Sequence, residues 1–304
     1  MRWYDVTEGV RLRREALMNR FVSFARQKDG RLQTAEAILT WAKESHELGY
    51  DANNLLNEYV KNRMSEERGV GASSVLWEYR ALSAFFRCAG ILVVKPRSLR
   101  IHGNTVDEHL LLTQQQVKRM VAACLQGGHP RRFLWRTLIA VLAQTGQRQS
   151  IVRALTPKMI EREICGGYGV VFVPPDLKGN KGRREYRFII GKQALRLIDE
   201  RITTKGLGGT DRIFQITEVQ ADRIVEKVAA EVGIQRVKQT KGGRKWHQVH
   251  PHTFRSYWEH QMNEGGAGWL VKFMMGHDPG PYFRCDLNDM FSAYKKVEPS
   301  LRVF

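Results

Sequence analysis

Two segments of the chain place cationic side chains where they could bind an anion. Arg148 follows the glycine of T-G-Q-R, after the apolar stretch W-R-T-L-I-A-V-L-A. Because glycine lets the backbone turn, this guanidinium is predicted to lie at a helix junction. His252 and Arg255, in H-P-H-T-F-R, are three residues apart, which puts both on one face of a helix. Such a pair can address one oxyanion.

Each segment also has an ordinary explanation. An arginine after a glycine more often makes a surface salt bridge or begins a helix, and the histidine pair is compatible with a capped helix that carries a satisfied imidazole. His247, His250 and His252 together form a possible metal site. No cysteine or carboxylate stands at ligand spacing beside them, so we predict no bound metal and no other cofactor.

Two later segments add an imidazole and a phenol. The stretch W-L-V-K-F-M-M-G-H-D-P predicts an amphipathic helix that ends at Gly276 and His277. The stretch D-M-F-S-A-Y-K-K-V presents Tyr294 beside two lysines. No single segment is enough to assign a function, and only the four segments together indicate one.

The charge of the chain points to a polyanionic partner. Lysine and arginine total 49 against 31 aspartate and glutamate residues, which gives a formal net charge of +18 and a pI near 10.0. Nucleic acid is the leading partner for such an excess, and a generally basic surface is the alternative. An anionic membrane surface is disfavoured because no long basic amphipathic helix stands out.

The cysteines and the N-terminus favour a protein that works in the cytoplasm, on DNA. Cys88, Cys124, Cys165 and Cys285 lie far apart without paired C-x-x-C spacing, so we expect reduced thiols. The first residues lack the apolar core of a signal peptide. No apolar run approaches the roughly 20 residues that span a bilayer, so no membrane contact is predicted.

The elements that must hold these residues fall into two predicted domains. Helical periodicity from about residue 13 to 90 predicts a small N-terminal bundle, whose last helix has Ser73 or Ser74 as N-cap and ends at Gly90. A polar, basic linker interrupted by Pro96 and Gly103 begins at about residue 91. We therefore predict domains at 1–104 and 105–304, as the chain length favours.

The second domain is predicted to mix helices with a hairpin. Thr113 and Gln116 form a capping box at the start of a helix. The runs V-V-F-V-P and R-E-Y-R-F-I-I predict a β-hairpin, with the basic turn D-L-K-G-N-K-G-R at its tip. Helices resume after Gly191 and are broken by R-V-K-Q-T-K-G-G-R-K-W-H-Q-V, a loop that either contacts DNA or is a solvated connection.

Together the segments resemble the motifs of the tyrosine recombinase (phage integrase and Xer-like) family. The first is similar to the family's T-G-x-R box, with Leu155 at the downstream apolar position. The second is similar to its P-H-x-L-R box, here P-H-T-F-R, followed by Gly265. The third carries the family's G-H, and the fourth a tyrosine with Val297 three residues later. The N-terminal part is similar only in its helical pattern and position.

The resemblance implies a fold and a catalytic set. The fold is mainly α with a small β-sheet, namely an N-terminal helical core-binding (SAM-like) bundle and a C-terminal α+β catalytic domain. The basic turn resembles the family's G-K-G-N-K-x-R, which puts Lys178 at the catalytic lysine, with Lys181 as a substitute. The implied catalytic residues are Arg148, Lys178, His252, Arg255, His277 and Tyr294.

Three departures from the family pattern are visible. Ile151 stands where the family usually has an acidic residue, and Ser256 where it usually has histidine. The stretch between His277 and the proposed tyrosine is longer than usual and contains Tyr282. We favour Tyr294 as nucleophile because A-Y-K-K-V fits the family context and P-G-P-Y predicts a turn. Tyr282 is the alternative.

The implied activity is site-specific DNA recombination or integration. Arg148 and Arg255 would hold the non-bridging oxygens of a phosphodiester, and His277 would hydrogen-bond the same phosphate. Lys178 would protonate the leaving 5′ oxygen, and His252 would assist proton movement at the tyrosine. The tyrosine would form a 3′-phosphotyrosine bond that is later rejoined to another 5′ hydroxyl, without metal or ATP.

The expected partners are double-stranded DNA with a specific recombination site and further copies of the chain. By family likeness, four protomers would assemble on two sites, with the tail V-E-P-S-L-R-V-F docking on a neighbour. One rival is a type IB topoisomerase that relaxes DNA. A second, encouraged by Ile151 and Ser256, is a non-catalytic DNA-binding protein of the same fold. A third, a telomere resolvase, usually has a longer chain.

Overall fold

The computed structural model describes most of the chain in two compact units. The described residues are 8–45, 52–65, 72–93, 111–126, 131–162, 166–177, 180, 184–239, 245–277 and 285–304. One unit is formed mainly by the chain up to Asp107, and the other by the chain from Glu108 onward. Within the described ranges, no helix is both long and apolar enough to cross a membrane.

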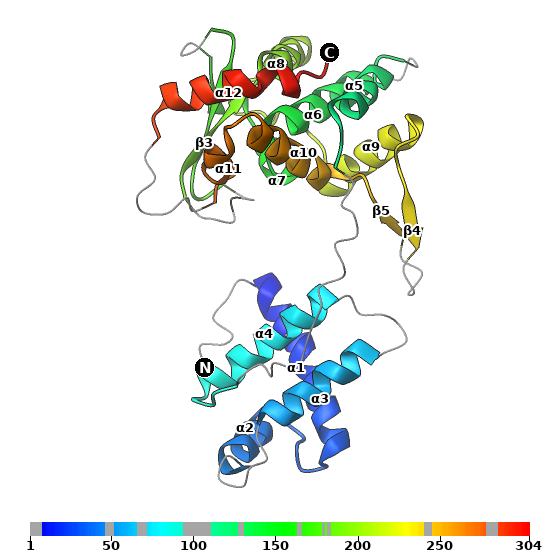
Figure 1. The fold of residues 1–304 in the computed structure, drawn as a ribbon, viewed down its shortest axis with the longest axis vertical. Coiled ribbons are helices and arrows are strands. Elements are labelled where there is room, and N and C mark those ends of the chain that lie inside the picture. Colours follow the sequence, from blue (N-terminus) through cyan, green and yellow to red (C-terminus); the bar gives the residue numbers. More distant parts are fainter. Residues whose placement is uncertain are drawn as a thin grey trace. The chain divides into compact units, whose positions relative to one another are not determined.

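The described part of the N-terminal unit is helical, as predicted (Figure 1). Its helices are α1 (Glu8–Lys28), α2 (Ala35–Glu44), α3 (Ala52–Ser65) and α4 (Ala72–Cys88). They bury an aromatic core in which Phe21 meets Tyr59 edge to face with 5.2 Å between ring centroids. Phe86 lies on the same phenylalanine at 6.0 Å, so α1, α3 and α4 are joined through one side chain.

The predicted start of α4 is wrong, and its predicted end is confirmed. The helix begins at Ala72, so Ser73 and Ser74 lie inside its first turn and neither is the N-cap. Gly90 follows the last turn with a φ of 81°, a left-handed conformation that favours glycine and ends the helix as predicted.

A buried carboxylate ties the helices of this unit together. Glu78 of α4 is 4% exposed and accepts hydrogen bonds from Tyr59 Oη (2.9 Å) and Arg63 Nε (3.0 Å) of α3. Arg20 Nη2 of α1 adds a contact of 3.1 Å. Burial opposes ionisation, but the hydrogen bonds from Arg63 and Tyr59 and both arginine charges hold the pKa of Glu78 below its ordinary value.

The second unit is mainly helical with a small sheet, which confirms the predicted fold class. Its elements are α5 (Gln114–Ala123), α6 (Arg132–Thr145), α7 (Gln149–Ala154), a 3-10 turn (Pro157–Met159), β1 (Ile160–Glu161), β2 (Gly169–Val173), β3 (Tyr186–Ile190), α8 (Lys192–Lys205), α9 (Glu218–Glu231), β4 (Val237–Gln239), β5 (Lys245–His247), α10 (Pro251–Glu264), α11 (Gly268–Met274) and α12 (Leu287–Leu301).

The predicted hairpin and capping box are both present. Strands β2 and β3 pair antiparallel, with Val171 opposite Phe188, and β1 extends the sheet beside β2. Thr113 Oγ1 accepts from the Gln116 amide at 3.2 Å while Gln116 Oε1 accepts from the Thr113 amide at 2.8 Å. The basic stretch before α10, predicted as a loop, contains β4 and β5, which form a two-stranded sheet.

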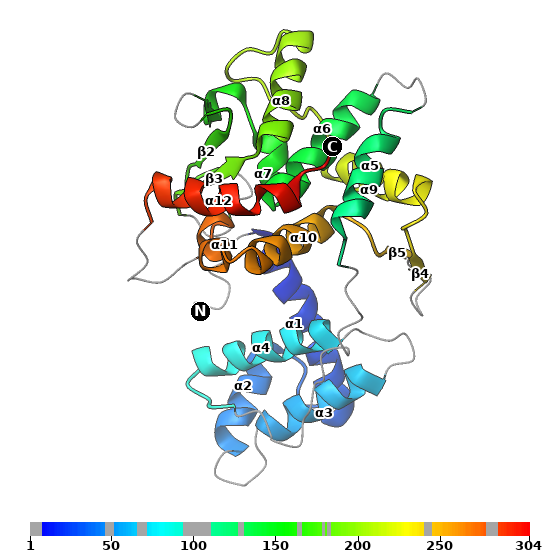
Figure 2. The same cartoon turned by 45° about the horizontal axis from the view of Figure 1, so that its top comes forward.

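Helix α6 is the centre of the second unit. Its residues from Leu138 to Ala143 are 0% exposed, so the helix is covered on all sides. It packs against α8 and α10, and α12 lies across α6, α10 and β3 (Figure 2). Because so many elements contact it, the residues that follow its C-terminal end are firmly placed.

The last residues pack onto the same unit, where the sequence suggested a neighbouring copy. Gln114 Nε2 of α5 donates to the carbonyls of Pro299 (2.7 Å) and Arg302 (3.0 Å). Gln193 Oε1 of α8 accepts from the Val303 amide at 2.7 Å. The Phe304 ring lies below guanidinium groups of α6 and α8, 4.6 and 5.2 Å from its centroid. In this structure the tail is docked in cis.

Candidate phosphate-binding site

Three of the predicted site residues meet at one point in the second unit. Nη2 of Arg148 lies 3.3 Å from Nε2 of His277, and Nη2 of Arg255 lies 3.1 Å from the same nitrogen. These residues come from the start of α7, from α10 and from the end of α11. We call Arg148, Arg255 and His277 the arginine cluster.

Gly146 places Arg148. It ends α6 in a left-handed conformation with φ of 60°, and a Cβ at this position would lie 2.6 Å from the Trp258 ring. Only glycine fits both conditions. The chain therefore turns sharply against α10, and Arg148 becomes the N-cap residue of α7. The glycine of the T-G-Q-R segment has the role that its sequence position predicted.

Arg255 is fixed by backbone carbonyls. It is 5% exposed, and its Nη1 donates to Gly146 O at 2.9 Å while Nη2 donates to Met275 O at 3.2 Å. Burial, and then the charge of Arg148, lower its pKa to about 10. The guanidinium is still protonated at neutral pH, so a buried positive charge stands at the centre of the site.

His277 is held neutral by its surroundings. Its amide donates to Lys272 O at 2.8 Å, which closes the turn after α11. Burial and then the charges of Arg255 and Arg148 lower the pKa of its imidazole. Because two guanidinium groups approach Nε2, this nitrogen acts as an acceptor and the ring proton belongs on Nδ1.

One donor of the arginine cluster has no acceptor among the described residues. Nη1 of Arg148 is buried without a hydrogen-bond partner in the described residues. No described carboxylate forms an ion pair with Arg148 or Arg255. A buried donor without an acceptor is costly. The arrangement is suited to an oxyanion that supplies two or more acceptor oxygens.

Sequence reasoning missed two residues that support the cluster, Gln147 and Tyr186. Gln147 is 1% exposed, and its Nε2 donates to Met274 O at 2.7 Å while its Oε1 accepts from Tyr186 Oη at 2.9 Å. Burial raises the pKa of Tyr186 to about 12, against the opposing charges of the arginines. Gln147 thus joins the loops that carry Arg148 and His277 to strand β3. The sequence contained one indication of this role, because Gln147 is a polar residue between the turn glycine and Arg148 of the T-G-Q-R segment.

The remaining predicted residues of the cationic set, His252 and the hairpin lysines, are not described in contact with the arginine cluster. His252 is exposed in the otherwise buried first turn of α10, one turn before Arg255. Its ring centroid is 6.3 Å from that of His250. Lys178 and its substitute Lys181, which the sequence predicted at the hairpin tip, lie outside the described residues.

Tyr294 is not brought to the arginine cluster. Its side chain is 0% exposed, and its hydroxyl donates to Gln144 O inside the second unit at 2.8 Å. Tyr168 packs edge to face against it at 6.0 Å. Burial, and then the charge of Glu298, raise the pKa of its hydroxyl well above 10. This position runs against the expectation that Tyr294 attacks a phosphate, and Tyr282 lies outside the described residues.

Of the two substitutions that depart from the family pattern, the structure explains Ile151 and not Ser256. Ile151 is 0% exposed and packs in the core of the second unit, so an apolar contact replaces the family's acidic residue. Gln149, one residue after Arg148, donates to Asp222 Oδ1 of α9 at 3.2 Å. An acidic side chain therefore reaches the start of α7 from another helix. Ser256 is half-buried on α10, and nothing in the structure explains it.

Comparison with known proteins places this unit among recombinases. Residues 111–279 match the model of the phage integrase family. No curated protein matches the chain. The fold is similar to the XerH site-specific recombinase bound to palindromic difH substrate (TM-score 0.59, 16% identity, 93% of this chain and 77% of that chain). It is also similar to the Tn1549 transposon integrase with circular intermediate DNA (TM-score 0.52, 16% identity, 90% and 97%).

Proposed function

The chain belongs to the phage integrase family as a site-specific tyrosine recombinase, and from this premise we propose that the arginine cluster binds the scissile phosphate of duplex DNA. The observation that carries the proposal is the buried Nη1 of Arg148, which has no partner among the described residues, beside the buried charge of Arg255. A phosphodiester has two non-bridging oxygens, and planar guanidinium groups can donate hydrogen bonds to both of them.

The cluster would act by stabilising charge that develops during strand cleavage. In the transition state the non-bridging oxygens gain negative charge, and donors already in place stabilise it without reorganisation. The backbone carbonyls that hold Arg255 keep one guanidinium fixed before DNA arrives. We expect the loss of one such donor to lower cleavage by about 10² to 10³.

His277 would change its role when the phosphate binds. In the free protein its Nε2 accepts from the arginines, and their charges lower the pKa of the ring. A bound phosphate neutralises part of that positive charge and draws the guanidinium donors to its own oxygens. The pKa of His277 then rises, and Nε2–H can donate to the phosphate.

Two of the proposed proton-transfer roles follow the family resemblance. Lys178 would protonate the 5′ oxygen as its bond to phosphorus breaks, with Lys181 as the substitute. His252, one helical turn before Arg255, would assist proton movement at the attacking tyrosine. A substrate whose 5′ leaving oxygen is replaced by sulfur needs no acid, because a thiolate leaves readily. Such a substrate is expected to rescue cleavage by a Lys178→Ala variant and not by Arg148→Ala.

For the nucleophile, the enclosure of Tyr294 favours Tyr282. The Tyr294 hydroxyl is bound to a main-chain carbonyl of α6 and has no exposed surface. It could attack only if α12 left its place against α6, α10 and β3. Tyr282 follows His277 by five residues in the sequence. In the proposed step a tyrosine Oη bonds to phosphorus, the 5′ oxygen leaves with a proton, and the strand is held as a 3′-phosphotyrosine.

The nucleophile is tested by trapping the covalent complex. The protein, Tyr282→Phe and Tyr294→Phe are each incubated with sheared DNA from the protein's source and quenched with detergent. Protein-linked fragments are then sequenced and the linked peptide is mapped. We expect adducts at one recurring sequence from the unaltered protein and from Tyr294→Phe, and none from Tyr282→Phe.

The other outcomes of this experiment contradict parts of the proposal. An adduct mapped to Tyr294, and lost in Tyr294→Phe, would restore Tyr294 as the nucleophile and require α12 to open. The absence of an adduct from the unaltered protein, with DNA binding intact, would favour the non-catalytic alternative. DNA binding by each variant, measured by gel shift, is the control for folding.

We further propose that the N-terminal unit contacts DNA through α4 and that four protomers assemble on two sites. Arg80 and Arg87 are exposed two turns apart on α4, and Trp77, 39% exposed, lies on the same face. Replacing both arginines by glutamine should lower the slope of log affinity against log salt by roughly one per arginine. An unchanged slope would contradict this contact. Sedimentation of the protein with two-site DNA tests the tetramer.

A further inference from the structure

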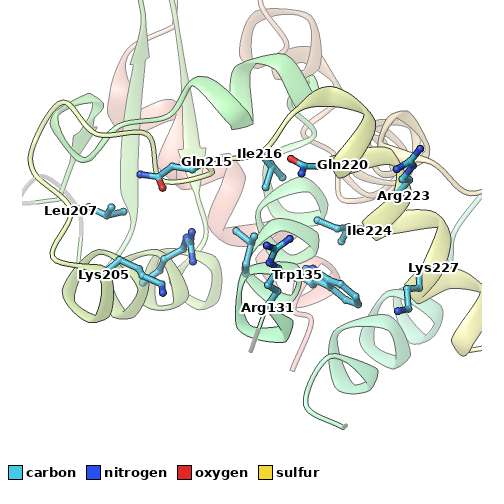
Figure 3. Close-up of a pocket in the computed structure, with 12 residues that line it drawn as sticks. Arg131, Trp135, Lys205, Leu207, Gln215, Ile216, Gln220, Arg223, Ile224 and Lys227 are labelled. Atoms are coloured by element: carbon cyan, nitrogen blue, oxygen red, sulfur yellow. The ribbon is translucent and has the colours of Figure 1, made fainter. Parts of the chain in front are cut away.

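A pocket of about 590 Å³ lies in the second unit between the start of α6, the end of α8 and α9. Figure 3 shows its labelled side chains arranged around this space. It is distinct from the arginine cluster, because α6 has 14 residues and the cluster follows its other end, about 20 Å away along the helix. Its lining is Arg131, Leu134, Trp135, Arg201, Lys205, Leu207, Gln215, Ile216, Gln220, Arg223, Ile224 and Lys227.

The charge of the lining has one sign. Arginines and lysines come from α8, α9 and the start of α6, and no aspartate or glutamate is among the described residues of the lining. Lys205, Arg223 and Lys227 are exposed and stand around the opening. Like charges held around one concave space repel one another, so an anion that enters is attracted by all of them.

Arg201 is the second observation that points to an anionic ligand. It is only 8% exposed, and its Nε donates to Ile213 O at 2.7 Å. No described carboxylate pairs with this guanidinium, and burial lowers its pKa. A buried charge without a counter-ion destabilises a fold, and an apolar residue of similar size would pack at less cost. Stability does not explain the residue, whereas a ligand carboxylate would.

The apolar part of the lining narrows the class of ligand. Leu207 and Ile216 are half-buried, and with the buried Leu134 and Ile224 they form an apolar wall that a bare inorganic anion would leave uncovered. Lys227 Nζ lies 5.2 Å from the Trp135 ring centroid, so a stacking nucleobase would have to displace it. Duplex DNA is too broad for a pocket of this volume, and its phosphates do not reach a side chain as buried as Arg201.

We propose that this pocket binds an acidic peptide segment of a partner protein, with a carboxylate on Arg201 and a neighbouring bulky apolar side chain against Leu207 and Ile216. A side-chain carboxylate extends far enough from a peptide backbone to reach a buried guanidinium, which it can meet with two parallel hydrogen bonds. Further acidic residues of the peptide meet the cations at the opening, and Gln215 and Gln220 offer amide groups to its backbone.

The proposal is tested by selection on the full-length protein. A phage-displayed library of random peptides is selected on the unaltered protein after removal of phage that bind an Arg201→Leu variant. We expect enriched sequences that combine glutamate or aspartate with leucine, phenylalanine or tryptophan. Fluorescence anisotropy of one labelled peptide should then show binding at least about 10-fold weaker to Arg201→Leu and to Arg223→Glu/Lys227→Glu.

Matched controls separate the pocket from general charge and from loss of folding. Lys118→Glu, on α5 outside the pocket, makes the same kind of charge change and should bind the peptide normally. Arg201→Leu should keep its thermal midpoint and its formation of covalent DNA adducts. Enriched peptides without acidic residues, or equal affinity for Arg201→Leu, would overturn the proposal. So would ATP or duplex DNA that displaces the peptide better than the unlabelled peptide does.

Discussion

Each of the two units of this chain brings two arginines together, but within the part of the chain that the structure describes only one of them provides a carboxylate to neutralise their charge. In the N-terminal unit, Arg20 and Arg63 converge on Glu78, whose side chain is 5% exposed. In the second unit, Arg148 and Arg255 converge on His277, a neutral acceptor. The first group contains its own counter-ion within the fold. The second has none among the described residues and leaves one buried donor unsatisfied.

This difference distinguishes a structural use of arginine from a functional one. A carboxylate between guanidinium groups joins helices α1, α3 and α4, and the network needs nothing from outside. Two guanidinium groups around a neutral ring form an incomplete network, which an incoming oxyanion completes. Removal of a member should therefore reduce stability in the first case and catalysis in the second.

The largest effect is expected from Arg148→Ala. Its side chain is only half-buried, and among the described residues its one hydrogen-bonding contact is with His277, so folding should change little. Covalent adduct formation should fall by about 10² to 10³, because a preorganised donor to the transition state is lost. Quench-flow measurement of adduct formation on the recovered DNA site checks this. A cleavage rate equal to that of the unaltered protein would remove Arg148 from the phosphate site.

Glu78→Gln should have the next largest effect, on stability. The substitution keeps the shape of the side chain but leaves Arg63, 13% exposed, without its counter-ion. Breaking a buried pair in this way costs about 3 kcal/mol or more. Urea unfolding followed by circular dichroism measures the loss, and adduct formation under native conditions should be unchanged. If Glu78→Gln were as stable as the unaltered protein, the network would not be what joins these helices.

The same network has an expected pH dependence. The pKa of Glu78 is lowered in the fold, so its stabilising contribution is complete above the unfolded value near 4.3. As the pH falls below that value toward the folded pKa, the unfolded chain binds the proton more readily and the contribution is lost. Glu78→Gln should therefore unfold with a shallower dependence on acid pH.

A smaller effect is expected at Gln147, which connects the cluster to strand β3. Gln147→Leu keeps the volume but removes the acceptor for Tyr186 Oη and the donor to Met274 O. We expect the maximal rate of adduct formation to fall by roughly 10-fold, while the DNA concentration at half-saturation stays the same. Tyr186→Phe, which removes one of these bonds, is the matched control and should lose less. A change confined to DNA affinity would show that Gln147 does not position the cluster.

The smallest effect is a pKa shift at His277. Burial, Arg255 and Arg148 all lower the pKa of its imidazole. Arg148→Ala removes one of these charges, so the pKa should rise toward 6.5, and the ring should protonate at a higher pH. A nuclear magnetic resonance titration of the ring protons measures it, with His277→Gln to assign the signal. An unchanged pKa would mean that Arg148 and His277 do not share one site in solution.

Much of the second unit follows from local patterns in the sequence. The apolar run before Thr145 is a buried helix, the β-rich runs are a hairpin, and Thr113 forms its capping box. The motif arginines and the histidine of G-H converge because Gly146 turns the chain against α10. These features depend on residues close in sequence or on motifs with a fixed geometry.

The features that the sequence did not predict depend on distant partners. Gln147 connects to β3 and to the end of α11, neither of which is adjacent in sequence. The enclosure of Tyr294 depends on a carbonyl of α6, 150 residues away. The strands β4 and β5 are three residues each, too short for periodicity to distinguish from a loop.

The most direct test of the central claim removes the charge of the phosphate itself. Cleavage by the unaltered protein and by Arg148→Ala is compared on the recovered DNA site, first with a normal scissile phosphate and then with a neutral methylphosphonate. If Arg148 stabilises phosphate charge, the variant should be about 10² to 10³ slower on phosphate and nearly equal to the unaltered protein on methylphosphonate. The same ratio on both substrates would contradict the account, because the arginine would then not be acting on that charge.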